Sequence, residues 1–247
     1  MNQNNWLDRT EKLIGKENLQ KLKNSNIVVF GLGGVGSYVV EALIRSGIEH
    51  IAIIDSDIVD ITNINRQLIA DINNVGISKV KVESERILNI NPNAKIIAIN
   101  NFIDKNNLPK VMENINTNFA LGNTSDNFNI DYVIDAIDTI SSKLEIIKFC
   151  HTNNINLISC MGTGNKLDCS KFKIVDINKT SVCPLARIIR KELKKLQIPH
   201  LKVLYSDEIP LKTNSSAPAS ISFVPSTAGL MIAGEVIRSL CFDYVES

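Results

Sequence analysis

Four glycines separate an apolar run from an amphipathic segment near the start of the chain. In VFGLGGVGSYVVEALIRSG, residues 29–47, Gly31, Gly33 and Gly36 fit the spacing G-x-G-x-x-G. This spacing permits a tight turn, and the N–H groups that begin the next helix are available to phosphate. Asp55 ends the next apolar run, where a carboxylate accepts hydrogen bonds from ribose hydroxyls. The pattern predicts a nucleotide site for ATP or a dinucleotide, the alternative being a simple tight turn.

A polar and cationic cluster after Asp55 favours ATP. Asn63, Arg66 and Gln67 fall within one turn, and Lys79 follows. Arg and Lys in one pocket neutralise a triphosphate through charge-assisted hydrogen bonds worth about 1.5–3 kcal/mol each. A solvated helix face is the alternative, and it is the simpler interpretation of Lys79 taken by itself.

Two carboxylates end the apolar run DYVIDAIDT. Asp135 and Asp138 follow a predicted strand, and a carboxylate at the carboxyl end of a parallel strand points into the ligand crevice. Asp138 is a candidate ligand for Mg²⁺ that bridges phosphate oxygens. The alternative for Asp138 is a cap on the helix predicted from about residue 140.

Apolar runs and helical patterns alternate through the first 160 residues. The near-continuous Ile and Val content of the runs suits a parallel sheet covered on both faces. Predicted strands are 26–30, 50–55, 95–99, 131–136 and 155–159, and predicted helices are 35–46, 78–90, 105–115 and 140–152. The order predicts an α/β fold with a Rossmann-like doubly wound, mostly parallel sheet and a C-terminal antiparallel extension.

The alternation breaks after residue 160. We predict a strand over 171–177, a helix over 184–197, a mobile segment over 206–220, a strand over 221–225 and a helix over 226–240; the Asn-rich stretch 114–130 is predicted to be an irregular loop. No linker or repeat divides the chain. The prediction is one domain, 1–247, with a nucleotide-binding core over about 25–160 and a crossover, substrate and dimer region over about 161–247.

Composition places bounds on location and partners. The net charge is only +1, which is not that of a nucleic-acid coat or a membrane-surface protein. No secretory signal or membrane span is expected. Five cysteines without a C-x-x-C pair are typical of reduced thiols in a cytoplasm.

These motifs carry a family resemblance. GLGGVGS, DSDIVDITNINRQ, VGISKV and VIDAIDT resemble the adenylating enzymes of the ThiF/MoeB/HesA superfamily, relatives of ubiquitin-activating enzymes, from about Arg9 to the C-terminus. The resemblance implies an enzyme that uses ATP and Mg²⁺ to activate a carboxylate. It also implies that Arg9 reaches the ATP of a partner subunit in a homodimer. The predicted catalytic residues are Arg9, Arg66 and Lys79; the predicted nucleotide-binding residues are Gly31, Gly33, Gly34, Gly36, Asp55, Asp57, Asn63, Arg66, Gln67, Lys79 and Asp138, with Asp138 as the metal ligand.

A subgroup matches more closely. RTEKLIG, INRQ, VIDAIDT, MGTGNKLD and KTSVCPLARIIRKELKK resemble the tRNA threonylcarbamoyladenosine dehydratases. This implies ATP-dependent cyclisation of the modified adenosine beside the anticodon to a hydantoin, with loss of one water. Gly162, Thr163, Gly164 and Asn165 are candidates to contact the threonyl group. The sequence leaves open whether a sulfur-transfer or other accessory protein takes part.

Ring closure within one nucleoside requires no protein thioester. Well-oriented intramolecular attack reaches effective molarities of about 10⁵–10⁸ M. Cys183 precedes a predicted helix, which can activate a thiol, but packing is the favoured interpretation; Cys150, Cys160, Cys169 and Cys241 are interpreted as core or loop thiols. His50, His151 and His200 belong to no recognisable triad.

The predicted helix 184–197 is amphipathic. Its apolar face holds Leu185, Ile188, Ile189, Leu193 and Leu196, and the opposite face holds Arg187, Arg190, Lys191, Lys194 and Lys195. Clustered like charges repel one another and favour a polyanion. The resemblance favours tRNA contact by this face; a solvated helix is the alternative.

Two other functions stay open. An activator of a ubiquitin-like or sulfur-carrier protein is one, although many such enzymes hold zinc with two C-x-x-C pairs, which this sequence lacks. A dinucleotide oxidoreductase or nucleotide-binding module is the other, and the Asn63, Arg66 and Lys79 set argues against it.

Overall fold

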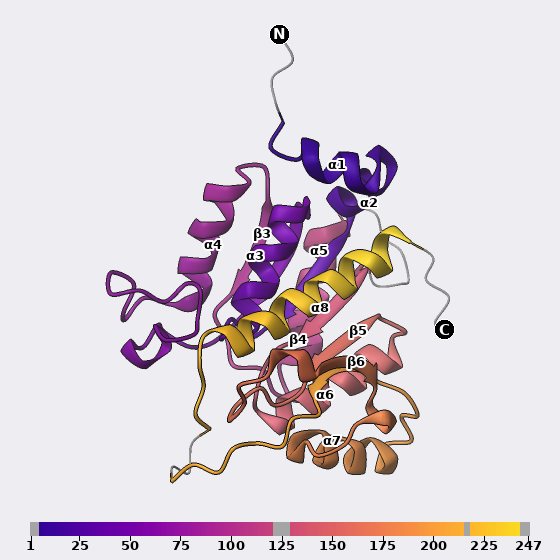
Figure 1. The fold of residues 1–247 in the computed structure, drawn as a ribbon. Helices are drawn as coiled ribbons and strands as arrows, with labels where there is room; N and C mark the ends of the chain where they lie inside the picture. The colour runs from indigo at the N-terminus through magenta and orange to yellow at the C-terminus, as the bar shows by residue number, and fades with distance from the viewer. Residues whose placement is uncertain (1–4, 121–128, 215–217, 243–247) are drawn as a thin grey trace.

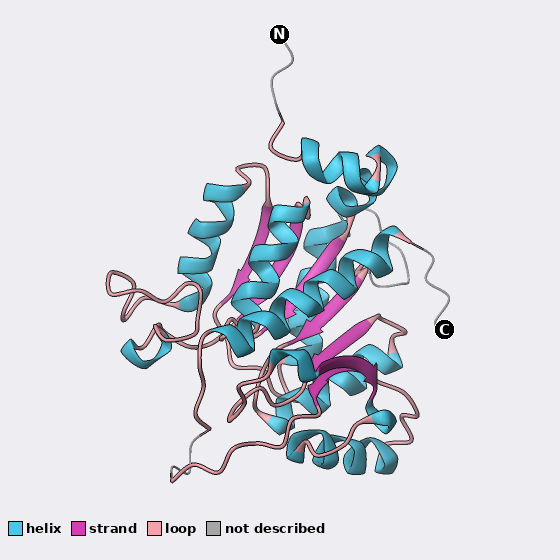
Figure 2. Ribbon diagram, viewed as in Figure 1, coloured by secondary structure: helices cyan, strands magenta, loops and turns pink. Residues whose placement is uncertain are grey.

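A single twisted sheet organises the molecule. The computed structural model describes residues 5–120, 129–214 and 218–242, and within them seven strands follow the order β3-β2-β1-β4-β5-β7-β6 (Figures 1 and 2). The strands are β1 (Asn26–Phe30), β2 (His50–Ile54), β3 (Lys95–Ile99), β4 (Tyr132–Asp135), β5 (Leu157–Cys160), β6 (Phe172–Asp176) and β7 (Lys202–Ser206). All neighbours pair in parallel except β6 and β7. The predicted doubly wound sheet with an antiparallel C-terminal extension is confirmed.

Helices cover both faces of this sheet. They are α1 (Asp8–Ile14), α2 (Lys16–Asn24), α3 (Gly36–Ser46), α4 (Lys79–Ile90), α5 (Leu108–Ala120), α6 (Ile140–Thr152), α7 (Pro184–Lys195) and α8 (Phe223–Cys241). Alternate residues of β1 serve opposite layers, as strand geometry requires. Ile27 and Val29 pack with α3, α4 and α8, whereas Val28 and Phe30 pack with α5 and α6.

Two predicted features differ from the structure, and one strand was not predicted. Residues 221–225 do not form a strand, because Phe223 begins α8 and Pro225 is tolerated in the first helical turn. Residues 114–120 are not an irregular loop, because Ile115 and Phe119 continue the buried face of α5; residues 121–128 lie outside the described part. Strand β7, absent from the predictions, lies between β5 and β6.

Candidate nucleotide site

A cavity of about 840 Å³ opens at the carboxyl ends of the central strands, a volume suited to a small-molecule ligand. Loops that follow β1, β2, β3, β4 and β5 all line it. Of the predicted nucleotide-binding residues, its lining includes Gly31, Gly33, Gly34, Asp55, Asp57, Asn63, Arg66, Gln67, Lys79 and Asp138. Residues from five separate segments therefore meet where a doubly wound sheet binds its ligand.

The glycine turn is set by close backbone contacts. Gly31 has φ of +90°, and a Cβ there would lie 2.8 Å from the Ala136 carbonyl oxygen. A Cβ on Gly36 would lie 1.7 Å from the Gly31 carbonyl oxygen. Gly36 therefore shapes the turn rather than lining the cavity, while at Gly33 the space is open. A phosphate can approach that part of the backbone closely.

Asp55 is fixed against the glycine turn. Its Oδ2 accepts a hydrogen bond of 2.7 Å from the Leu32 N–H, and its Oδ1 accepts one of 2.8 Å from the Asp57 N–H. Burial raises the pKa of this carboxyl, although Lys79 and the two amides act in the opposite direction. Each oxygen keeps a second lone pair, which fits the ribose contact predicted for Asp55.

Lys79 begins α4 and is only 4% exposed. Its Nζ lies 2.7 Å from Asp57 Oδ2 and 3.9 Å from Asp55 Oδ1. The alternative of a solvated lysine is therefore wrong. The side chain of Asp57 is mostly exposed, so a bound phosphate and Asp57 would compete for the same ammonium group.

The 3₁₀ turn Ile61–Asn63 presents the rest of the cluster. Asn63 Oδ1 accepts from the Asp60 N–H at 3.2 Å, while Arg66 donates to the Thr62 carbonyl at 3.1 Å and to Asn65 Oδ1 at 3.0 Å. Gln67 is 6% exposed, and its Oε1 has no hydrogen-bond partner. Leaving such a group unpaired costs about 1–3 kcal/mol, so a cavity ligand with a donor would satisfy it.

The two aspartates after β4 differ in position. Asp138 is exposed and lines the cavity, and Thr139 rather than Asp138 occupies the N-cap position of α6. Asp135 does not point into the crevice, which corrects the prediction. Its carboxylate is fully buried, and Lys143 Nζ and Ser159 Oγ offset the cost of burial by donating to Oδ2 at 2.7 and 2.6 Å.

Two parts of the lining were absent from the sequence predictions. Asn101, Phe102 and Ile103 follow β3, and Pro218, Ala219 and Ser220 approach from the C-terminal third. The position of Asn101–Ile103 just after a strand was a usable signal. Residues 218–220 belong to the segment 206–220, which was predicted only to be mobile, and the tertiary fold brings them to the cavity. The predicted threonyl contacts Gly162, Thr163 and Gly164 also line the cavity, whereas Asn165 stands just outside its lining.

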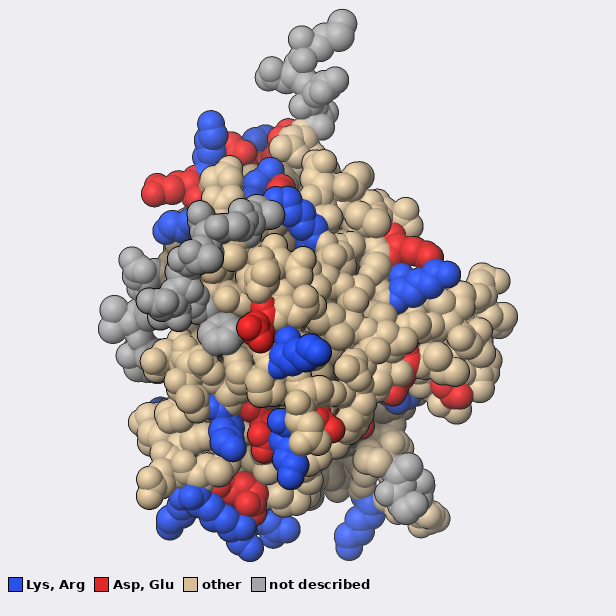
Figure 3. Space-filling model, turned by 180° about the vertical axis from the view of Figure 1, so that it is seen from behind, with Lys and Arg blue, Asp and Glu red and all other residues tan. Residues whose placement is uncertain are grey.

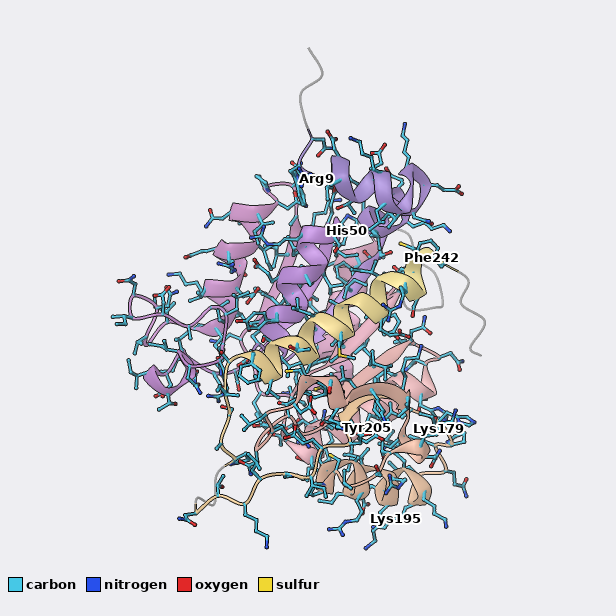
Figure 4. The ribbon with its side chains drawn as sticks, viewed as in Figure 1. Arg9, His50, Lys179, Lys195, Tyr205 and Phe242 are labelled. Carbon is cyan, nitrogen blue, oxygen red and sulfur yellow. The ribbon has the colours of Figure 1, made fainter. Side chains whose placement is uncertain are left out.

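Arg9 lies far from the cavity of its own chain. Leu7 packs beside Gly47 at the carboxyl end of α3. The glycine turn lies at the amino end of the same helix. Helix α3 has 11 residues, about 16 Å at 1.5 Å per residue. Figure 4 places Arg9 at the end of the molecule that carries α1 and α2, opposite Lys195.

Helix α7 supplies an exposed basic face. Arg187, Lys191, Lys194 and Lys195 are exposed, and Figure 3 shows Lys and Arg gathered at the edge where α7 lies. Arg190 is partly buried and donates to the carbonyls of Ile177 and Thr180 and to the Thr180 hydroxyl. Ile188 and Leu196 were predicted on the apolar face of this helix, but both are exposed. The buried face consists of Ala186, Ile189 and Leu193.

Cys160 lines the cavity, and the other four cysteines are outside its lining. Cys183 is buried in the cluster beneath α7, and burial raises the pKa of Cys150 and brings that of Cys160 to about 12. Within the described residues no histidine lines the cavity. Nor is there a group of three His, Cys, Asp or Glu that could hold a metal in that part of the chain.

The described helices include none long and apolar enough to cross a membrane.

A doubly wound sheet with a glycine turn, a buried carboxylate and cationic side chains at one crevice has the architecture of a nucleotide-binding protein of the Rossmann type. The chain belongs to the ThiF family, whose model matches residues 7–245. It is 40% identical over 253 aligned positions to the tRNA threonylcarbamoyladenosine dehydratase of Bacillus subtilis, covering 95% of this chain and 94% of that protein.

Solved structures agree with this assignment. The Escherichia coli tRNA N6-threonylcarbamoyladenosine dehydratase TcdA in complex with AMP superimposes with a TM-score of 0.84 at 32% identity, covering 94% of this chain and 92% of that one. The complex of the same enzyme with ATP gives a TM-score of 0.82 at 32% identity over the same coverage. The similarity therefore extends over almost the whole of each chain.

Proposed function

We propose that this chain is an ATP-dependent tRNA threonylcarbamoyladenosine dehydratase. One observation carries the proposal: Asp55, Lys79, Arg66 and Asp138 line one cavity in a chain that is 40% identical to such an enzyme over 95% of its length. The substrate is tRNA that carries threonylcarbamoyladenosine beside the anticodon. Since the substrate is tRNA and the cysteines are free thiols, we infer that the reaction takes place in the cytoplasm.

The first step activates a poor electrophile. An oxygen of the threonyl carboxylate attacks the α-phosphorus of ATP, the bond to the bridging oxygen breaks, and pyrophosphate leaves. Asp55 binds the ribose, and the amides of the glycine turn with Asn63 and Gln67 hold the nucleotide. Arg66 and Lys79 stabilise the negative charge that grows on the phosphoryl oxygens. The two cations therefore act as preorganised electrostatic catalysts.

Asp138 fits a magnesium site. Its carboxylate is exposed at the cavity edge, and Mg²⁺ is commonly bound by one or two carboxylates together with substrate phosphates and waters. The bound ion would supply charge neutralisation to the phosphate oxygens.

The second step closes the ring. A nitrogen of the carbamoyl group attacks the adenylated carbonyl, AMP leaves, and one proton is released. Both reacting groups belong to one nucleoside, so orientation within the cavity supplies the rate advantage. Cys183 is buried beneath α7, and no step needs it.

We infer that the active unit is a homodimer in which Arg9 serves the partner's cavity. Arg9 is exposed and about one helix length from its own glycine turn. Trp6 and Leu13 beside it are 49% and 84% exposed, which leaves an apolar surface for a partner to cover. Arg187, Lys191, Lys194 and Lys195 on α7 would contact the tRNA phosphates.

The products of ATP test this function. The purified protein is incubated with Mg·ATP and either threonylcarbamoyladenosine-containing tRNA or the same tRNA without the modification. We expect equimolar AMP and pyrophosphate only with the modified tRNA. Formation of ADP and phosphate, or equal pyrophosphate release with both tRNAs, would contradict the proposal.

A further inference from the structure

Asn165 joins the two ends of the segment 211–219. Its N–H donates to the Ala219 carbonyl at 2.8 Å, and its carbonyl accepts from the Leu211 N–H at 2.7 Å. Its side-chain Oδ1 accepts from the Ala219 N–H at 2.7 Å. Asn165 has φ of +58°, a left-handed conformation that asparagine tolerates better than most residues. One residue therefore connects both Leu211 and Ala219 to the loop that follows β5.

The next residues strengthen the attachment. Lys166, which is buried, donates from Nζ to the Glu208 carbonyl at 2.6 Å. The Glu208 carboxylate in turn accepts from the N–H groups of Leu167 and Asp168, each at 2.9 Å. The chain before Leu211 is therefore held by several bonds, and at Ala219 both described hydrogen bonds are made with Asn165.

The Ala219 end is also a wall of the cavity. Pro218, Ala219 and Ser220 line it together with Gly164. A Cβ on Gly164 would lie 2.7 Å from Pro218 Cβ, so the wall packs directly on the loop after β5. On its other side, Asn65 Nδ2 donates to the Ser220 carbonyl at 3.2 Å. The wall thus bridges the β5 loop and the loop after β2.

The sheet order indicates what this wall bounds. Asp55, Lys79 and the glycine turn place the nucleotide over β2 and β1, which neighbour β4 and then β5. Asp138, after β4, serves the phosphates in the proposed function, so the part of the cavity over β5 is left for the group that receives AMP. Gly164 and Pro218 meet in that part.

We infer that Asn165 is a positioning residue that sets substrate specificity: it holds Pro218–Ser220 as the wall of the acceptor half of the cavity. The inference rests on the proposed function. Asn165 acts through the hydrogen bond that its Oδ1 accepts from the Ala219 N–H, so the wall keeps its contact with the modified nucleoside equally in the ground state and in the transition state. Loss of that bond loosens the wall at Ala219, while Asp55 and Lys79 keep their own hydrogen bonds.

Asn165→Gly is the variant that isolates this bond, because glycine accepts the positive φ without strain. Asn154→Gly is the matched control, since Asn154 has φ of +53° and precedes β5 at its opposite end. We expect Asn165→Gly to raise KM for modified tRNA about tenfold, as for one hydrogen bond. The Kd of ATP and kcat should stay within twofold, and Asn154→Gly should leave all three unchanged.

Amide hydrogen exchange supplies a measurement that does not need turnover. Asn165→Gly should speed exchange of the Ala219 amide at least tenfold and leave the β5 amides unchanged. Unaltered Ala219 exchange, an unaltered KM for tRNA, or an equal rise in the KM for tRNA and the Kd of ATP would overturn the inference. If the wild-type protein releases no pyrophosphate with modified tRNA, the proposed function fails, and the exchange result still decides whether Asn165 holds the wall.

Discussion

At the scale of single residues, Lys79 is a buried cation in the lining of the cavity. It is nearly inaccessible to solvent, and its ammonium group lies between Asp55 and Asp57. In low-dielectric surroundings a fixed charge stabilises a developing anion more strongly than it does in water. The buried position therefore favours a catalytic contribution over simple attraction of the nucleotide.

Replacement of Lys79 tests this contribution. We expect Lys79→Ala to lower kcat/KM by about 10²–10³-fold, the usual loss for one preorganised donor. Lys81→Ala is the matched control because Lys81 is exposed on the same helix. Steady-state kinetics with modified tRNA would measure both. A Lys79→Ala enzyme with wild-type kinetics would remove Lys79 from the mechanism.

At the scale of secondary-structure elements, a buried ion pair joins α6 to the ends of two strands. Lys143 donates to Asp135 of β4 and to the Ser159 hydroxyl and Cys160 carbonyl of β5, at 2.7, 3.1 and 3.0 Å. Both charged side chains are fully buried. The pair fixes the loops that carry Asp138 and Gly162 relative to each other.

Breaking this pair should destabilise the protein strongly. Lys143→Met leaves an uncompensated buried carboxylate, which typically costs about 3–5 kcal/mol. The double variant Asp135→Asn/Lys143→Met removes both charges and should regain most of that loss. Urea denaturation would measure the free energy of unfolding. A single variant as stable as the wild type would show that the pair contributes no net stability.

Glu83, a buried residue of α4, makes the free energy of unfolding depend on pH. Burial, with repulsion from Glu41, raises its pKa well above the ordinary 4.5, while Arg86 acts in the opposite direction. Above about pH 4.5 the unfolded chain loses this proton while the folded protein keeps it. The group therefore lowers stability as pH rises toward its folded pKa, by at most about 1.4 kcal/mol per pH unit.

Glu83→Gln removes that titration while preserving shape. The variant should gain stability relative to the wild type as pH increases from 5 toward 8, and the gain should be small near pH 4.5. Thermal unfolding at a series of pH values would reveal it. A constant difference between the two proteins across this range would mean that Glu83 is not protonated in the folded state.

The predictable part of the molecule was the part with local signals. Strands β1 to β5 and the glycine turn follow from apolar runs and residue spacing. Strand β7 was missed because Lys202–Ser206 is short and lies close behind the helix α7. No clear break in the sequence pattern marks where the strand begins. The buried state of Asp135 depends on Lys143, eight residues further on, and on Ser159. Contacts of that kind cannot be derived from spacing alone.

At the scale of the whole molecule, the separation of Arg9 from its own cavity has a kinetic consequence. If Arg9 acts in the partner's site, each site uses Lys79 of one subunit and Arg9 of the other. Arg9→Ala therefore impairs the partner's site, whereas Lys79→Ala impairs the site of its own subunit. Mixing the two inactive variants should restore about a quarter of wild-type turnover, since half of randomly paired dimers carry one intact site. No recovery after verified subunit exchange would mean that Arg9 does not act across the dimer.

The basic face of α7 provides a second prediction at this scale. Arg187→Ala/Lys191→Ala/Lys194→Ala should weaken tRNA binding and reduce its salt slope by about three, one for each lost phosphate contact. Binding of ATP should be unchanged. The control Lys105→Ala/Lys110→Ala/Lys148→Ala removes the same charge from exposed positions elsewhere. Equal losses in both triple variants would indicate a general charge effect and not contact by α7.

Mass analysis of the modified nucleoside tests the central claim most directly. tRNA bearing threonylcarbamoyladenosine is incubated with the purified protein, with and without Mg·ATP, and is digested under mild conditions because base reopens the ring. We predict that the nucleoside loses the mass of one water only when Mg·ATP is present. An unchanged nucleoside mass, with a cyclic standard shown to survive the same digestion, would contradict the proposed dehydratase activity.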